Sequence, residues 1–331
     1  MRFNIIRKIL ITGGSGFIGT NLITMILENN NCQVLNIDIV QPKMGLYNKY
    51  WVQCDILDQR KLINLFSSFN PDVVIHLAAK VDVEGKTLDD YKVNTEGTKN
   101  ILNSIKKTKS VKRVIITSTQ FVNQYNGIPK NDEDYSPHTI YGESKVITEQ
   151  VTREAELECC WTIIRPTNIW GPWHWRYPKE FWKVIAEGKY FHPKGNNVIR
   201  SYGFVGNVVW QIQRFLDIEE YKVNKQVFYV GDKSINILEW VNGFSKLQIG
   251  KNVRLVSPIF VKGLAILGDI LKGIGVTFPI TSSRYKSMTT SNALPMDKTF
   301  NLLGNPPYNL EESIKLTVNW LKVYYPHLVK I

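Results

Sequence analysis

The sequence has few cysteines and few histidines. Its 331 residues include five histidines and four cysteines, Cys32, Cys54, Cys159 and Cys160. The cysteines lack the paired spacing of a small disulfide-bonded protein, and no Cys or His cluster has metal-ligand spacing. We therefore expect reduced thiols, as in a cytoplasmic protein, and no metal site.

Long hydrophobic runs are also missing. The first apolar run lasts only a few residues, so we expect no signal peptide. The most apolar later stretch, Leu255 to Pro279, is interrupted by Lys262, Asp269 and Lys272, which excludes a bilayer-spanning helix. Two interpretations of it stay open: an amphipathic helix on the protein's own core, or a helix on a membrane surface.

Acidic residues are fewer than basic ones. Lys and Arg total 41 and Asp and Glu total 29, which gives a formal net charge of +12. This balance favours an anionic partner: nucleic acid, a membrane surface or a small anionic substrate. The densest basic run, residues 106–113, lies at a predicted helix end without a nucleic-acid-binding motif, so we expect no nucleic-acid partner.

A glycine-rich turn near the start is the most informative feature present. Gly13, Gly16 and Gly19 follow a short apolar strand at 8–12 and overlap the start of an apolar helical pattern at Phe17. Glycine permits a tight turn, close approach of the backbone to a pyrophosphate, and close packing of helix on strand. The pattern therefore predicts a dinucleotide site at a helix N-terminus.

An acidic residue lies where such a site needs one. Asp38 ends a second apolar strand, 33–38, nineteen positions after Gly19. A carboxylate there accepts hydrogen bonds from ribose hydroxyls and repels a 2′-phosphate, which favours NAD over NADP. Lys43 follows closely and would soften that repulsion.

Strand and helix patterns alternate through the first half of the chain. Strands are predicted at 8–12, 33–38, 50–54, 72–77, 111–117 and 161–165, and helices at 17–27, 58–69, 87–107 and 139–155. This alternation predicts an α/β fold, a Rossmann-type doubly wound parallel sheet, over residues 1–170. Beyond Gly171 prolines interrupt short elements, which predicts a smaller, irregular C-terminal substrate-binding lobe at 171–199 and 233–331. Residues 200–232, with a strand at 227–230, are expected to rejoin the sheet.

One tyrosine and one lysine have a spacing that suggests catalysis. Tyr141 and Lys145 lie four positions apart on a predicted helix and hence on the same face. A phenol with its ordinary pKa near 10 is a poor base at neutral pH, and a nearby ammonium, helped by the positive nicotinamide ring of NAD, lowers that pKa. Hydroxyls at 117–119, after the fifth strand, would orient a substrate alcohol.

Together these motifs resemble the extended short-chain dehydrogenase/reductase family, in its NAD-dependent nucleotide-sugar epimerase/dehydratase branch. The resembling segments are TGGSGFIG at 12–19, HLAA at 76–79, VNTEGT at 93–98, YGESK at 141–145 and RPTNIWGP at 165–172. They occur in one fixed order over residues 8–172, whereas the later residues match only loosely.

The resemblance implies a role for particular residues of this chain. Tyr141 would be the acid/base, Lys145 would hold the nicotinamide ribose and Thr119 would be the catalytic hydroxyl. The implied NAD-binding residues are Gly13, Gly16, Phe17, Ile18, Asp38, Asp55, Ile56, Leu77, Ala78, Ala79, Lys80, Thr117, Tyr141, Lys145 and Pro166. Asn168, Arg200 and Arg284 would contact the substrate diphosphate.

The reaction implied begins with proton removal from a sugar hydroxyl while NAD accepts hydride from the same carbon. In the family's 4,6-dehydratases an Asp-Glu pair follows the catalytic threonine, but here Gln120 and Phe121 do. The resemblance therefore favours an epimerase at C4 of a UDP-hexose, through a 4-keto intermediate. A 4,6-dehydratase, a ketoreductase and a hydroxysteroid-type dehydrogenase, suggested by apolar residues 264–274, stay open. A non-enzymatic NAD-sensing relative is disfavoured because both Tyr141 and Lys145 are present.

Several further features carry weaker expectations. Trp170, Trp173, Trp175 and Trp182 cluster where the second lobe begins, either to pack or to stack on a substrate, and His174 is either structural or a second acid/base. The family resemblance also implies a homodimer through helices 87–107 and 139–155, and a role in polysaccharide biosynthesis.

Overall fold

The computed structural model describes residues 7–28, 32–124, 127, 129–195, 197–276 and 278–331. These residues form two compact units. The first takes the chain up to Ile169 together with Val205–Gly231 and Pro295–Pro306. The second takes Trp170–Phe204, Asp232–Leu294 and the chain from Pro307 onward.

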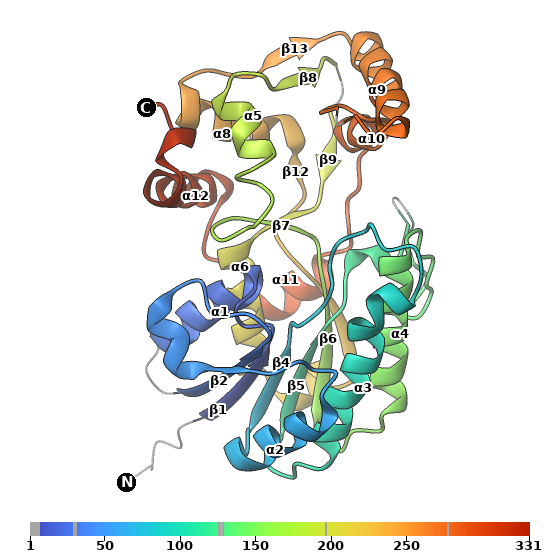
Figure 1. Cartoon of the computed structure of the whole chain (residues 1–331), viewed down its shortest axis with the longest axis vertical. Coiled ribbons are helices and arrows are strands. Elements are labelled where there is room, and N and C mark those ends of the chain that lie inside the picture. Colours follow the sequence, from blue (N-terminus) through green and yellow to red (C-terminus); the bar gives the residue numbers. More distant parts are fainter. Residues whose placement is uncertain (1–6, 29–31, 125–126, 128, 196, 277) are drawn as a thin grey trace. The chain divides into compact units, whose positions relative to one another are not determined.

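A seven-stranded sheet forms the centre of the first unit (Figure 1). In spatial order its strands are β3 (Trp51–Gln53), β2 (Cys32–Asp38), β1 (Arg7–Thr12), β4 (Val73–His76), β5 (Arg113–Thr117), β6 (Cys160–Pro166) and β11 (Gln226–Val230). Neighbouring strands are parallel. The order reverses between β1 and β4, which places the expected ligand crevice at the carboxyl ends of these strands. The predicted doubly wound α/β fold is confirmed.

Helices cover both faces of this sheet. They are α1 (Phe17–Glu28), α2 (Gln59–Phe69), α3 (Lys92–Lys106), α4 (Ile140–Glu154), α6 (Val205–Phe215), α7 (Glu220–Val223) and α11 (Asp297–Leu303), with 3₁₀ turns η1 (Gly45–Tyr50), η2 (Asp89–Tyr91) and η3 (Gln120–Val122). Helices α2, α3 and α4 pack in succession, and α1, α6 and α11 form a second group. Because both faces are covered, the central strands are apolar on both sides, as Ile9, Leu10 and Ile11 show.

One predicted helix begins later than its sequence pattern suggests. The prediction began it at 87, whereas α3 begins at Lys92 after the turn η2. Asp90 accounts for the difference because its Oδ2 accepts the backbone N–H groups of Lys86 and Thr87 at 2.9 and 3.0 Å. Such a side-chain bond competes with the helical backbone pattern.

The second unit is built from short elements around an aromatic cluster. Its elements are α5 (Phe181–Ala186), β8 (Phe191–Pro193), β9 (Ile199–Arg200), β10 (Tyr202–Phe204), β12 (Ile235–Asn236), α8 (Ile237–Ile249), β13 (Arg254–Val256), α9 (Pro258–Gly273), α10 (Ser282–Thr289), α12 (Leu310–Tyr324) and η4 (Pro326–Leu328), and β7 (Asn168–Trp170) leads into it. Trp170 is fully buried and its ring packs against those of Phe204, Trp240 and Phe244. Within the described ranges, no helix is both long enough and apolar enough to cross a membrane.

Candidate functional site

The glycine turn between β1 and α1 is held tightly against the sheet. Gly13 has a φ of +73°, and a Cβ atom there would lie 2.6 Å from the backbone nitrogen of Ala78. Its own N–H donates to the carbonyl oxygen of Ile37 at 2.8 Å. Only glycine both adopts this positive φ readily and leaves room for the Ala78 backbone. The turn therefore presents its backbone, and the N-terminus of α1, at the carboxyl edge of the sheet.

Asp38 is tied to the same turn. Its Oδ2 accepts the N–H of Ser15 at 3.0 Å and its Oδ1 accepts the N–H of Val40 at 3.1 Å. Burial raises the pKa of this carboxyl above its ordinary value, although the backbone N–H donors oppose the change. Each carboxylate oxygen has a second acceptor position, so Asp38 can still bind a ribose hydroxyl.

A chain of hydrogen bonds fixes the segment after β4. The hydroxyl of Thr12 accepts the N–H of Ala78 at 3.3 Å and lies 2.7 Å from Nδ1 of His76. The other ring nitrogen of His76 lies 3.2 Å from the hydroxyl of Thr98. Burial lowers the His76 pKa to about 3, so the ring is neutral. The sequence marked His76 only as part of a motif and gave it no role.

Asn94 joins this segment to α4. Its Oδ1 accepts the N–H of Lys80 at 2.8 Å, and its Nδ2 donates to the Lys80 carbonyl and the Ser144 hydroxyl, both at 3.0 Å. All of its amide contacts are therefore to the predicted cofactor-binding segment 77–80 and to α4. The sequence placed Asn94 in the VNTEGT motif without a role, because its complete burial follows only from the structure.

Tyr141 and Thr119 meet at the carboxyl end of β5. Both side chains are buried, and the Thr119 hydroxyl is among the groups that act on the Tyr141 phenol. Burial raises the Tyr141 pKa to about 12, while the Thr119 hydroxyl opposes the change. The lowered pKa expected from the sequence depends on a nearby ammonium together with the positive nicotinamide ring of a bound cofactor. In the chain without a cofactor, the loss of hydration on burial disfavours the charged phenolate more than the Thr119 hydroxyl stabilises it.

Lys145 lies one turn further along α4. Its Nζ donates to the Thr117 carbonyl at 2.8 Å, and its side chain is 2% exposed. Burial lowers the Lys145 pKa to about 8, and the negative charge of Glu149 partly opposes this. The lysine is therefore fixed between α4 and the end of β5.

The Thr117 hydroxyl tests whether the site fits a bound cofactor. It is buried and, among the described residues, has no hydrogen-bond partner. Such a group is costly unless a bound molecule supplies a partner. Thr117 is one of the residues predicted to lie against NAD, so this unpaired hydroxyl at the strand end fits the proposed cofactor.

A buried ion pair supports α4 behind the lysine. The Glu149 carboxylate accepts Nε and Nη2 of Arg165, both at 2.8 Å, and the hydroxyls of Ser118 and Tyr135 at 2.6 and 3.0 Å. Burial by itself would raise the Glu149 pKa, but the hydrogen bonds and charge of Arg165 hold it below its ordinary value. The sequence reasoning missed this pair because its partners are far apart in the chain.

The other predicted residues of the first unit lie along the same edge. Ile56 is buried, whereas Asp55 is exposed and accepts the N–H of Leu57 at 2.9 Å. Pro166 ends β6. The Oδ1 of Asn168 accepts Nε2 of Gln120 at 2.8 Å, so the residue after Thr119 is held by an amide contact.

The two arginines predicted to bind substrate belong to the second unit. Arg200 is buried, and its Nη1 donates to the Thr290 carbonyl at 3.0 Å. Arg284 is partly exposed and pairs with Glu180 at 3.1 Å.

His174 and the tryptophans have mainly packing contacts. Nδ1 of His174 accepts the N–H groups of Arg176 and Tyr177, both at 3.2 Å, and its ring stacks on Tyr177. Trp182 is fully buried, whereas Trp175 is 51% exposed. These contacts favour the structural interpretation of the histidine.

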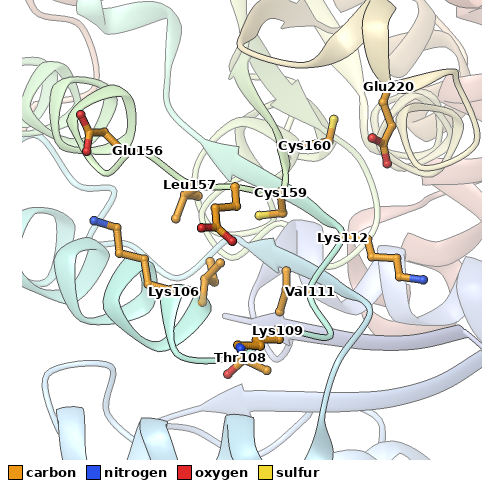
Figure 2. Close-up of a pocket in the computed structure, with 12 residues that line it drawn as sticks. Lys106, Thr108, Lys109, Val111, Lys112, Glu156, Leu157, Cys159, Cys160 and Glu220 are labelled. Carbon is orange, nitrogen blue, oxygen red and sulfur yellow. The ribbon is translucent and has the colours of Figure 1, made fainter.

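A cavity of about 790 Å³ lies at the amino ends of β5 and β6, away from this edge. Figure 2 shows Lys106, Lys109 and Lys112 around it, together with Cys159 and Glu220. Burial raises the Cys159 pKa to about 11, so the thiol stays protonated. Ligands of open parallel sheets bind at the carboxyl ends, so this cavity is not the expected site. In the part of the chain described, no cluster of three or more His, Cys, Asp or Glu residues could hold a metal ion.

The fold and the carboxyl-edge site define a dinucleotide-binding α/β protein of the short-chain dehydrogenase/reductase type. The chain belongs to the NAD dependent epimerase/dehydratase family, whose profile matches residues 9–231.

Named relatives cover nearly the whole chain. It is 28% identical to the N-acetyl-alpha-D-glucosaminyl-diphospho-ditrans,octacis-undecaprenol 4-epimerase of Escherichia coli O157:H7, over 95% of both chains. It is 27% identical to mouse 3 beta-hydroxysteroid dehydrogenase type 7, also over 95% of both. The solved UDP-glucose 4-epimerase of Thermotoga maritima shares the fold, with a TM-score of 0.74 and 23% identity over 96% of this chain and 99% of that one.

Proposed function

We propose that the chain is an NAD-dependent epimerase that inverts C4 of a hexose carried on a diphosphate, with a UDP-hexose as the first candidate. The observation that carries this proposal is the pair of buried hydroxyls, Tyr141 and Thr119, at the end of β5, where Lys145 is bonded to the Thr117 carbonyl. The first relative reported above, a 4-epimerase by name, supports it.

The cofactor would be held along the carboxyl edge of the sheet. NAD, when bound, supplies the acceptor and donor of hydride. Gly13, Gly16, Phe17 and Ile18 would bind its pyrophosphate, Asp38 the adenosine ribose, and Asp55 and Ile56 the adenine. Leu77, Ala78, Ala79, Lys80, Thr117 and Pro166 would line the remainder, and Lys145 would hold the nicotinamide ribose. The unpaired Thr117 hydroxyl and the backbone of the Gly13 turn support this assignment.

Tyr141 would take the proton from the C4 hydroxyl and later return it. Because burial raises its pKa to about 12 even with the Thr119 hydroxyl opposing the change, the phenolate needs a nearby cation. Lys145 supplies the cation, and Thr119 donates to the phenolic oxygen and orients the sugar hydroxyl. The Glu149–Arg165 pair keeps α4 and the end of β5 in place for this transfer.

The residues after Thr119 argue against dehydration. A 4,6-dehydratase needs an additional acid and base for the elimination of water. Gln120 is committed to Asn168 through its amide, and Phe121 carries no transferable proton. The structure therefore offers no proton-transfer group at these two positions.

The group that carries the hexose has two candidates, a nucleoside diphosphate and a polyprenyl diphosphate. Asn168, Arg200 and Arg284 would contact the diphosphate, which a nucleotide sugar and a polyprenol-linked sugar share. For Arg284 this would require release of Glu180. The relative from Escherichia coli acts on a polyprenol-linked sugar by its name, which favours that carrier as the second candidate.

The experiment is a C4-inversion assay on the purified chain with its bound cofactor. UDP-hexoses and a polyprenyl-diphosphate sugar are supplied in separate reactions, and products are identified by NMR. We expect inversion at C4 with NAD that stays bound between turnovers. Loss of water would assign a dehydratase instead. Release of one reduced cofactor per turnover, with a ketosugar as product, would assign a dehydrogenase or a ketoreductase that runs in its oxidative direction.

We further propose a homodimer that acts in the cytoplasm, in the synthesis of surface polysaccharides. These proposals are supported by the family resemblance and by the absence of paired cysteine spacing.

A further inference from the structure

Helix α9 presents a large apolar face to solvent. Five side chains of the helix form it, Ile259, Phe260, Ile266, Leu267 and Ile270, together with Ile274, which directly follows the helix. Their exposed fractions range from 45% at Leu267 to 83% at Ile259. Isolated exposed apolar residues are ordinary, but a contiguous group of this kind marks an interaction site. We call this group the α9 face.

The α9 face lies opposite the side that packs on the protein. Val261, Ala265 and Gly268 are the buried residues of the helix, and their spacing of four and three positions places them on one stripe. Ile259 and Ile270 differ by eleven positions, three turns of helix, and follow a second stripe half a turn away. The helix is therefore anchored along one narrow stripe, and its opposite apolar side is left uncovered.

The surroundings of the α9 face are basic. Between positions 251 and 290 the chain has six Lys or Arg residues and one acidic residue, Asp269. All six basic residues are exposed, and one of them, Arg284, pairs with Glu180. The Asp269 carboxylate accepts the N–H of Ser282 at the start of α10, at 3.2 Å, so the only acid of this segment has a contact within the unit.

We propose that the α9 face docks on an anionic membrane surface, with the helix lying in the plane of the interface. The apolar side of the helix would contact the acyl chains, and the basic residues of the segment would contact the anionic headgroups. A second copy of this chain would bring the same positive charge to the contact, so charge complementarity favours lipid. Helix α9 has 16 residues, too few to span a bilayer.

This docking goes beyond the proposed function and does not depend on it. If the substrate is carried on a polyprenol, docking would bring the enzyme to the surface in which its substrate resides. If the substrate is a nucleotide sugar, docking would localise the enzyme only.

The test is co-sedimentation of the full chain with phosphatidylcholine vesicles that contain or lack phosphatidylglycerol. We expect binding to the anionic vesicles that weakens with added salt. A double variant, Phe260→Ser with Ile270→Ser, removes two of the exposed side chains, and we expect its vesicle affinity to fall roughly tenfold or more. The control is Tyr221→Ser with Val323→Ser, which changes two side chains that are 78% and 71% exposed elsewhere.

Circular dichroism and urea unfolding check that both variants are folded, and we expect both to match the parent chain. Equal vesicle binding by the two variants would overturn the proposal. A parent chain that does not bind anionic vesicles would also overturn it. So would an α9 variant that changes the oligomeric state and leaves vesicle binding as it was. Since sedimentation requires no turnover, an inactive parent chain would contradict the proposed function without affecting this result.

Discussion

At the scale of single residues, burial decides the protonation states at this site. His76 is neutral because desolvation outweighs its ordinary basicity, and Tyr141 stays protonated in the chain alone for the same reason. The sequence gives the spacing of Tyr141 and Lys145, and hence their shared helix face. It does not give the degree of burial, which depends on distant residues such as Tyr91 of η2 and Phe121 of η3.

The low pKa of His76 predicts an acid-sensitive contribution to stability. Between pH 6.5 and about 3 the unfolded chain binds a proton on His76 that the folded chain does not. The contribution is therefore complete above pH 6.5 and is lost as the pH falls toward 3. In His76→Gln we expect the slope of unfolding free energy against pH to be shallower in this window, by up to about 1.4 kcal/mol per pH unit.

Urea unfolding at a series of pH values measures that slope. His327→Gln changes an exposed histidine and serves as the control. Identical slopes for His76→Gln and the parent chain would show that His76 is not the group responsible.

At the scale of elements, the site depends on how closely α4 approaches the end of β5. A Cβ atom at Gly142 would overlap the Phe121 carbonyl oxygen in η3. The neighbouring Thr139 side chain caps α4 by accepting the N–H of Gly142 at 2.9 Å. These contacts place Tyr141 against Thr119, although the two residues come from different elements.

Gly142→Ala tests this approach. We expect the added methyl group to push α4 from η3, to lower the free energy of unfolding by about 1–3 kcal/mol, and to reduce turnover by separating the two hydroxyls. Gly45→Ala is a matched control, because a Cβ there has no neighbour within 4 Å. Urea unfolding and turnover are both measured, and a Gly142→Ala chain with full activity would contradict the assigned geometry.

Much at this scale was readable from the sequence. The periodic apolar pattern gave α4 as 139–155, one residue from each observed end, and Asp58 was the first residue of the predicted second helix, where it caps α2. The start of α3 was missed because the Asp90 side chain captures nearby N–H groups. Apolar periodicity does not report that kind of local competition.

At the scale of the whole molecule, oligomeric state is the open structural prediction. The exposed charged residues of α3 are Lys92, Lys106 and the ion pair Lys99–Glu96, which leaves a net positive charge, whereas those of α4 are Glu143 and Glu154. Opposite charges on the two helices favour contact between α3 of one copy and α4 of another. We expect light scattering to give twice the mass of one chain at low salt.

A charge-reversal pair tests the contact. Lys92→Glu with Lys106→Glu should lower the dimer affinity, and the same changes at Lys222 and Lys233, outside both helices, should not. A monomeric parent chain at every accessible concentration would contradict the homodimer.

The sequence was least informative about the second unit. Its short elements are separated by prolines and pack through aromatic contacts distant in the chain, such as Trp170 with Trp240. Residue patterns over a few positions do not encode such contacts, and for this reason Arg200 and Arg284 stay predictions. The first unit was readable because each strand–helix repeat is local.

The most direct test of the central claim is Tyr141→Phe in the cofactor-loaded enzyme. Removal of the phenolic oxygen should lower turnover by about 10²- to 10⁴-fold, the usual contribution of a general acid/base. Bound NAD, measured by absorbance after denaturation, should stay at the parent level, and Tyr47→Phe, which removes a hydroxyl bonded to Thr24, should keep full activity. If Tyr141→Phe instead turns over at the parent rate with its cofactor bound, Tyr141 is not the acid/base and the mechanism is wrong.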